Sequence, residues 1–285
     1  MRLLVCIGVT IFNLSISNAQ LLDTLSIGDK IYFLDHLKNN NQIEDAIVLA
    51  NHFNKVCPHD SLKLIEIKYN LWNGRFLIAD SLLKTYFLNG IEYKINKCIL
   101  TLLQNHCELL KGNFDQLKNP SCKNHNEHRE TWKIQLLISC LNQKKLEEFN
   151  MLFDNQKCQN PVLSLIEFDL YVQMMDIKKN KVKNPLLAGM LSALIPGLGK
   201  VYAKKPHEAL TSLMPVAFNW IQAAEGYYYE QWRSPHFYIF GSIGTVFYFS
   251  NIAGSSLSAK RKNKEFNTYI KNNIDFETNK LISFY

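Results

Sequence analysis

The chain has few of the residues that form tight turns and catalytic loops. Only four Gly and three Pro occur between residues 20 and 180, whereas the whole chain of 285 residues contains 12 Gly and 8 Pro. A Gly-rich phosphate-binding loop is absent, and so is the G-x-S-x-G turn that presents a nucleophilic serine. These absences leave no recognisable catalytic set. We therefore predict a protein that is not an enzyme and that uses no cofactor.

Acidic residues are missing from one short stretch. Residues 178–205 contain seven Lys and no Asp or Glu, whereas residues 1–177 contain 18 basic and 19 acidic residues, and residues 206–285 contain seven and six. The net charge of +7 is therefore local. Nucleic-acid binding needs a basic face on a folded domain, so we exclude nucleic acid as a partner. Lysines beside apolar segments instead indicate membrane boundaries.

The N-terminus has the layout of a secretory signal peptide. Arg2 precedes an apolar run from Leu3 to Leu14, and small or polar residues lead to Ala19. We predict a signal peptide over residues 1–19, cleaved after Ala19; the alternative is an uncleaved anchor, and both export the following domain. Six Cys follow Ala19. They allow three disulfides in 15 pairings, or they are buried free thiols.

A helical domain is predicted over residues 20–180, because apolar residues recur there at spacings of three and four. Four similar segments start at residues 41, 74, 112 and 144. In each, a large apolar residue follows two places later and another apolar residue five places later. The starts are 33, 38 and 32 residues apart, which is typical of repeated helix-turn-helix units.

The stretch Y-N-L-W-N-G-R-F-L-I-A-D-S-L-L, residues 69–83, resembles the tetratricopeptide repeat, and L-L-K-G-N-F, residues 109–114, resembles it again. The resemblance implies stacked helix pairs with a groove that binds segments of other proteins. The alternative is an irregular helical bundle without a groove. The residues that would pack the repeats are Trp72, Gly74, Phe76, Ala79, Gly112 and Phe114.

Three apolar stretches follow Pro185. The first, residues 186–199, contains no charge but is interrupted by Pro196, so we predict a helix break near Ile195. The next two cover residues 207–228 and 237–257, where Pro206 and Ser234-Pro235 are placed to begin helices. We predict three membrane-spanning segments in residues 185–259, of which the first is short and broken, and a basic C-terminal tail over residues 260–285.

The stretch P-L-L-A-G-M-L-S-A-L-I-P-G-L-G-K-V-Y, residues 185–202, resembles a small bacterial membrane domain of unknown function that is related in pattern to the TM2 domain. The motif residues are Pro196, Gly197, Leu198, Gly199 and Tyr202. The chain departs from that pattern at Lys200, where Gln is usual. The resemblance implies a location in the lipid bilayer and implies no catalytic residues.

One weak metal candidate is present. Cys122, His125 and His128 recur at intervals of three residues, which would place them on one face of a helix, and Cys and His are zinc ligands. A fourth ligand with matching spacing is not evident. A polar loop between repeats is the simpler interpretation, so no metal site is predicted.

Together these features predict a mainly α-helical, noncatalytic scaffold or adaptor of the bacterial envelope. A tetratricopeptide-like domain would lie in the periplasm and bind an unidentified protein, and the C-terminal α-helical membrane domain would hold it at the cytoplasmic (inner) membrane. In the alternative, the membrane domain is the active part, in transport or envelope assembly, and the repeats are accessory.

Overall fold

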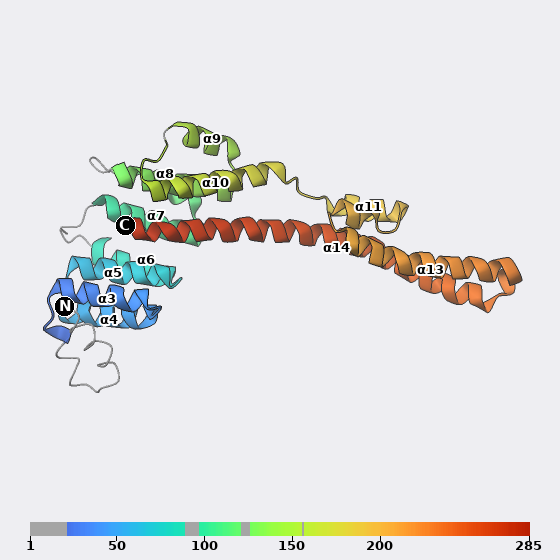
Figure 1. Ribbon diagram of the computed structural model, residues 1–285, viewed down its shortest axis with the longest axis horizontal. Helices are drawn as coiled ribbons and strands as arrows, with labels where there is room; N and C mark the ends of the chain where they lie inside the picture. Colours follow the sequence, from blue (N-terminus) through green and yellow to red (C-terminus); the bar gives the residue numbers. More distant parts are fainter. Residues whose placement is uncertain (1–21, 89–96, 121–125, 156) are drawn as a thin grey trace. The chain divides into compact units, whose positions relative to one another are not determined.

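The computed structural model describes residues 22–88, 97–120, 126–155 and 157–285 (Figure 1). Every regular element in these ranges is a helix, which confirms the prediction of a mainly α-helical fold. The chain divides into two compact units. Unit 1 comprises the residues up to Met174 together with Ile274–Tyr285, and unit 2 comprises Met175–Asn273. The predicted signal peptide, residues 1–19, lies outside the described residues.

Unit 1 is a succession of short helices joined by tight turns, coloured blue to yellow-green in Figure 1. Several begin at side-chain caps: the Ser26 hydroxyl, for example, accepts a hydrogen bond of 3.2 Å from the backbone N–H of Asp29 at the start of the first helix. The helices are α3 (Ile27–Asn39), α4 (Ile43–Val56), α5 (Asp60–Trp72), α6 (Phe76–Leu83) with a π-helical extension (Lys84–Leu88), α7 (Lys97–Lys111), the 3-10 helix η3 (Phe114–Gln116), α8 (Asn126–Gln143), α9 (Leu146–Asn155) and the part of α10 (Pro161–Lys179) up to Met174.

The four similar sequence segments adopt the same turn. Their first residues all have left-handed backbone conformations, with φ of 61° at Asn41, 71° at Gly74, 81° at Gly112 and 58° at Lys144. The N–H of the next residue then donates to the carbonyl five positions earlier, over 2.8–2.9 Å in all four turns. This is the hydrogen bond that closes a helix at a left-handed residue. Each turn ends one helix and places the apolar residue two positions later at the start of the next.

Burial of apolar side chains holds the successive helices together. Each helix from α3 to α8 packs against the next one along the chain. In the first pairs, Leu34, Ala46, Phe53 and Leu62 are fully buried in one core cluster. The Tyr69 hydroxyl at the edge of this cluster donates to Asp35 over 2.7 Å, which links α5 to α3.

The third pair lacks its second helix. After Gln116 the backbone becomes extended at Leu117, so only the 3-10 turn η3 forms. The Asn105 side chain of α7 captures the extended chain, because its oxygen accepts from the Lys118 N–H over 2.8 Å and its amide donates to the Lys118 carbonyl over 2.7 Å. A second helix here, as the repeat pattern predicts, would have to give up both bonds.

Unit 2 contains the predicted helix break and the predicted helix starts. The first helix, α11 (Pro185–Leu194), ends where Ile195 becomes extended. Pro206 occupies the first turn of α13, and the Ser234 hydroxyl accepts from the Phe237 N–H at the start of α14. The later elements are α12 (Leu198–Tyr202), α13 (Pro206–Glu230), the 3-10 helix η4 (Gln231–Arg233) and the part of α14 (Pro235–Lys280) that precedes Ile274.

The three membrane-spanning segments predicted in residues 185–259 are not found. Among the residues described, no helix is both long enough and apolar enough to cross a membrane. Helix α11 has only 10 residues. Polar residues interrupt α13 at Asn219, Gln222 and Glu225, and charged residues crowd α14 from Lys260 onward.

The predicted basic tail, residues 260–285, is not a separate region. Helix α14 continues unbroken to Lys280, and the 3-10 helix η5 (Leu281–Phe284) follows it directly. From Ile274 onward these residues belong to unit 1. The reason is burial: Leu281 and Ile282 are completely enclosed there.

Candidate functional site

The C-terminal segment of the chain lies on one face of unit 1. Residues of η5 contact α5 and α8, Tyr285 contacts His106 of α7, and the Lys280 ammonium lies 3.9 Å from the Asp169 carboxylate of α10. The end of α14 is visible beside these helices in Figure 1. Helices α5, α7 and α8 are the helices that precede the left-handed turns at Gly74, Gly112 and Lys144. We call this surface, formed by α5, α7, α8 and α10, the docking face.

A hydrogen-bond network at Tyr285 fixes the end of the segment. The Gln135 amide donates both to the Tyr285 hydroxyl and to the Leu102 carbonyl, over 2.8 Å each. The same hydroxyl lies 2.8 Å from His106 Nδ1, and the two rings pack edge to face with centroids 5.3 Å apart. His106 and Gln135 are completely buried. Because the hydroxyl accepts from Gln135, its own proton is available for His106.

Burial makes this network electrically neutral. It lowers the pKa of His106 to about 3, so the imidazole is uncharged at neutral pH and its Nδ1 can accept a hydrogen bond. Burial likewise raises the pKa of Tyr285, so the phenol keeps its proton. Neither group is tuned to transfer a proton near neutral pH. The arrangement places one acceptor, His106 Nδ1, and one donor, the Gln135 amide, against the Tyr285 hydroxyl.

The remaining buried positions of the segment form one helical stripe. Glu277 and Thr278 are buried together with the aliphatic residues. Burial raises the pKa of Glu277, against the opposing effect of Lys280, whose ammonium lies 2.8 and 2.9 Å from the two carboxylate oxygens. The Thr278 hydroxyl donates to the Ile274 carbonyl of its own helix. The stripe is Ile274, Glu277, Thr278, Leu281, Ile282 and Tyr285.

The Pro196-Gly197-Leu198-Gly199 motif forms a tight junction in unit 2. Gly197 has a left-handed φ of 90°, and a Cβ there would lie 2.8 Å from the Ala209 carbonyl oxygen. A Cβ on Gly199 would lie 1.8 Å from the Ala188 carbonyl oxygen, which no side chain tolerates. The motif therefore contains glycine where the backbones of α11, α12 and α13 meet.

Hydroxyl groups complete this junction. The Ser192 hydroxyl accepts from the Gly199 N–H over 2.9 Å and lies 2.6 Å from the Ser255 hydroxyl of α14. The Tyr202 hydroxyl accepts from the Asn184 N–H over 3.1 Å. These polar groups serve packing between helices, and the motif presents no reactive group.

Helices α13 and α14 of unit 2 expose many large apolar side chains. They pack against each other closely: a Cβ on Gly244 would meet Asn219 at 3.2 Å, and Phe218 and Phe240 pack edge to face. Their outer surfaces nevertheless remain apolar. The exposed residues include Leu210, Met214, Phe218, Trp220, Ile221, Tyr228, Ile239, Val246 and Phe249.

Four hydroxyl groups on these two helices bond to the backbone of their own helix. Thr211 and Ser212 donate to carbonyls one turn earlier in α13, and Ser242 and Thr245 do so in α14. The Asn219 amide similarly donates to the Pro215 carbonyl one turn earlier in α13, over 2.7 Å. Such bonds satisfy polar groups without water.

The weak metal candidate is only partly described. Cys122 and His125 lie outside the described residues, and His128 is half-buried in the first turn of α8. Within the described ranges no three His, Cys, Asp or Glu side chains gather as metal ligands would.

Among the described residues, one cysteine is disulfide-bonded and four are free thiols. Cys98 is disulfide-bonded. Cys57, Cys107, Cys140 and Cys158 are free. Burial raises the pKa of Cys107 and of Cys158 to about 12, which makes both poor nucleophiles.

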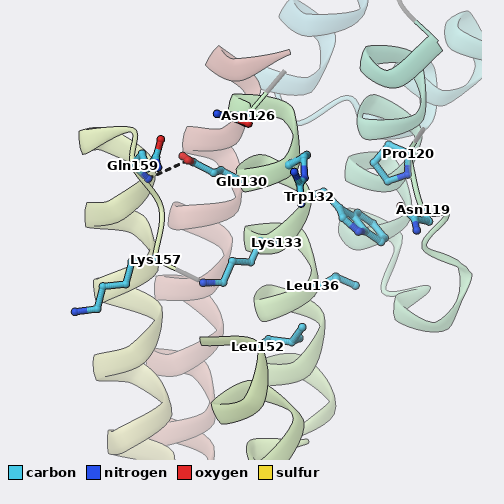
Figure 2. A pocket seen from close by; sticks show the side chains of 11 residues that line it. Asn119, Pro120, Asn126, Glu130, Trp132, Lys133, Leu136, Leu152, Lys157 and Gln159 are labelled. Atoms are coloured by element: carbon cyan, nitrogen blue, oxygen red, sulfur yellow. Dashed lines mark hydrogen bonds between the residues drawn. The ribbon is translucent and has the colours of Figure 1, made fainter. Parts of the chain in front are cut away.

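A cavity of about 490 Å³ in unit 1 lies among α8, α9 and the segments before α8 and after α9 (Figure 2). On one side, Glu130 accepts from the backbone N–H groups of Gln159 and Asn160 over 2.9 and 3.1 Å. On another, Lys133 pairs with the buried Glu167. These charges hold the chain after α9 in place. Each of the two carboxylates is thus already bound to protein groups, and the cavity contains no nucleophile beside a base.

Neither a protein-family model, nor a curated protein, nor a solved structure matches this chain.

The residues singled out from the sequence lie in two places. Gly74 and Gly112 form two of the four turns, Ala79 is fully buried, and Trp72, Phe76 and Phe114 are half-buried beside them. The Pro-Gly-Leu-Gly residues form the junction of unit 2. Sequence reasoning missed His106, Gln135 and Tyr285. The available signal was the apolar stretch L-I-S-F-Y at residues 281–285, which follows a polar helix without an obvious place in a core.

Proposed function

We propose that this chain is a noncatalytic adaptor of the bacterial envelope whose unit 1 binds a segment of another protein on the docking face. In this proposal unit 1 is a tetratricopeptide-like array on the periplasmic side. Unit 2 corresponds to the TM2-related membrane domain and holds the chain at the cytoplasmic membrane through contact with lipid.

The observation that carries the proposal is the helical segment on the docking face. Residues 274–285 contact helices α5, α7, α8 and α10, and their buried residues form one stripe along that segment. This is the geometry in which a groove receives an amphipathic helix. A surface that binds such a segment from its own chain has the shape and the hydrogen-bonding groups to bind one from another protein.

Two further observations support the location. Large apolar side chains are exposed on successive turns of α13 and α14, and contact with lipid would cover them. The disulfide of Cys98 is compatible with export, because disulfides persist in oxidising compartments such as the periplasm. The layout of residues 1–19 points the same way.

Site-specific photo-crosslinking in cells tests the protein-binding part. Leu165 of α10 is 65% exposed and lies one helical turn from Asp169, which contacts the docked segment, whereas Leu77 of α6 is 66% exposed on a helix outside the docking face. A photoreactive amino acid at position 165 should form a discrete crosslink to another protein. The same amino acid at position 77 should not. Absence of any product at position 165, with the chain present at normal amount, contradicts the proposal.

A further inference from the structure

We propose that residues 274–285 are an internal ligand that occupies the docking face and must leave before a partner segment binds there. The partner segment would have the same chemistry: an amphipathic helix whose buried stripe ends in two adjacent aliphatic residues and a hydroxyl-bearing aromatic one. This inference rests on the proposed function, because it describes the partner and the regulation of the same surface.

The first argument is the pattern of burial along the segment. Its buried residues recur at spacings of three and four, whereas Phe276 and Ser283 between them are exposed. One side of the helix therefore faces unit 1 and the other faces solvent. A helix in the centre of a core would be covered on all sides. This segment instead lies on the outside of the helices of unit 1.

The second argument is the chemistry of the surface beneath the segment. His106 and Gln135 both lie under Tyr285, and polar side chains of this kind can be hydrated when the segment leaves. An uninterrupted apolar surface would instead expose only hydrocarbon to water. The docking face is therefore suited to alternate between two occupants.

The third argument is specificity. The Tyr285 hydroxyl oxygen accepts a hydrogen bond from the Gln135 amide, and the hydroxyl faces the unprotonated Nδ1 of His106. A ligand without a hydroxyl at this position leaves His106 Nδ1 and one N–H of the Gln135 amide unbonded, which disfavours it. An aromatic residue with a hydroxyl bonds to both of these groups at once.

Peptide binding to the purified full chain tests the inference. The probe is a fluorescent synthetic peptide with the sequence of residues 274–285, I-D-F-E-T-N-K-L-I-S-F-Y. Leu281→Asp in the chain places a charge at a fully buried position and should release the internal segment without altering the docking face. The control is Ser283→Asp, which adds the same charge two residues away at an exposed position.

We expect the Leu281→Asp chain to bind the peptide at least tenfold more tightly than the unaltered chain or the Ser283→Asp chain. A peptide with Tyr285→Phe should bind the Leu281→Asp chain roughly tenfold more weakly than the original peptide, because it lacks the hydroxyl. Equal affinity of the original peptide for all three chains would overturn the proposal.

A second measurement uses the unaltered chain, so its result does not depend on whether the Leu281→Asp chain folds. Excess peptide carrying Phe276→Leu, a change at an exposed position that makes its mass distinct, is added to the unaltered protein. If the peptide replaces the internal segment, the backbone amides of residues 278–285 exchange with deuterium faster. Unchanged exchange at saturating peptide means that the segment is a permanent part of unit 1, and the inference fails.

The two proposals fail separately. Peptide exchange in the purified chain, with no crosslink from position 165 in cells, would leave the internal ligand intact and remove the adaptor function. A cellular crosslink whose yield is the same in the Leu281→Asp chain as in the unaltered chain would support the adaptor and remove the internal ligand.

Discussion

At the scale of single residues, the glycines of unit 2 differ sharply in how much room they have. The Cβ of an alanine at position 199 would lie 1.8 Å from a backbone oxygen of α11, so the helices must move apart to admit it. At position 241 of α14, the same Cβ would lie 3.9 Å from the Ala223 methyl group, an ordinary contact. The same substitution therefore has opposite consequences at the two sites.

We expect Gly199→Ala to lower the free energy of unfolding of unit 2 by about 3 kcal/mol, because overpacking forces backbone shifts. Gly241→Ala should change it by no more than about 1 kcal/mol and in the stabilising direction, because alanine favours helix. Thermal unfolding of both variants and the unaltered chain, followed by circular dichroism in the same detergent, measures the difference. Similar melting of the Gly199→Ala variant and the unaltered chain would show that the junction is looser than described.

At the scale of elements, the turns between helices depend on one left-handed residue each. Gly112 takes this conformation without strain, and a Cβ there would meet nothing within 4 Å. Lys144 takes it with φ of 58° in spite of its Cβ. Residues other than glycine adopt this conformation at a cost of about 1 kcal/mol.

Exchanging the residue types at these turns should therefore shift stability in opposite directions. We expect Lys144→Gly to stabilise unit 1 by about 1 kcal/mol and Gly112→Ala to destabilise it by a similar amount. Urea unfolding of the two variants at equal protein concentration checks the signs. A change of the same sign in both would indicate that side-chain contacts, rather than backbone conformation, determine these turns.

The elements that could be predicted from the sequence are those set by neighbouring residues. Pro196 and Gly197 fixed the break after Leu194, and Pro206 and Ser234 fixed helix starts, because proline geometry and capping act within one turn. The missing second helix after Phe114 could not be predicted in this way, because Asn105 captures the chain from another helix.

The candidate site could not be predicted from neighbouring residues either. His106 and Gln135 read as ordinary polar residues in two helices, and Tyr285 lies 179 residues from His106 in sequence. Only the folded chain brings them together. The repeat pattern indicated where the helices of unit 1 turn, but it contained no information on what covers them.

At the scale of the whole molecule, the two units present different surfaces. In unit 1, the exposed Met151 lies on α9 together with Glu147, Glu148 and Asp154, whereas the exposed Leu77 lies on α6, whose one charged residue is the buried Asp80. In unit 2, α13 and the first half of α14 expose aromatic and aliphatic side chains over successive turns. If contact with lipid covers the second surface, charges placed there should be far more harmful to membrane binding than charges placed on unit 1.

Flotation of the full chain with phosphatidylethanolamine–phosphatidylglycerol vesicles tests this difference. A chain with Ile221→Asp and Phe249→Asp should lose at least tenfold in its partition to vesicles, because a carboxylate in hydrocarbon costs about 2–3 kcal/mol. The matched control, Leu77→Asp with Met151→Asp, adds the same charge to similarly exposed apolar positions of unit 1 and should float as the unaltered chain does. Equal flotation of both double variants would place the membrane contact away from α13 and α14, whereas loss with the control alone would assign it to unit 1.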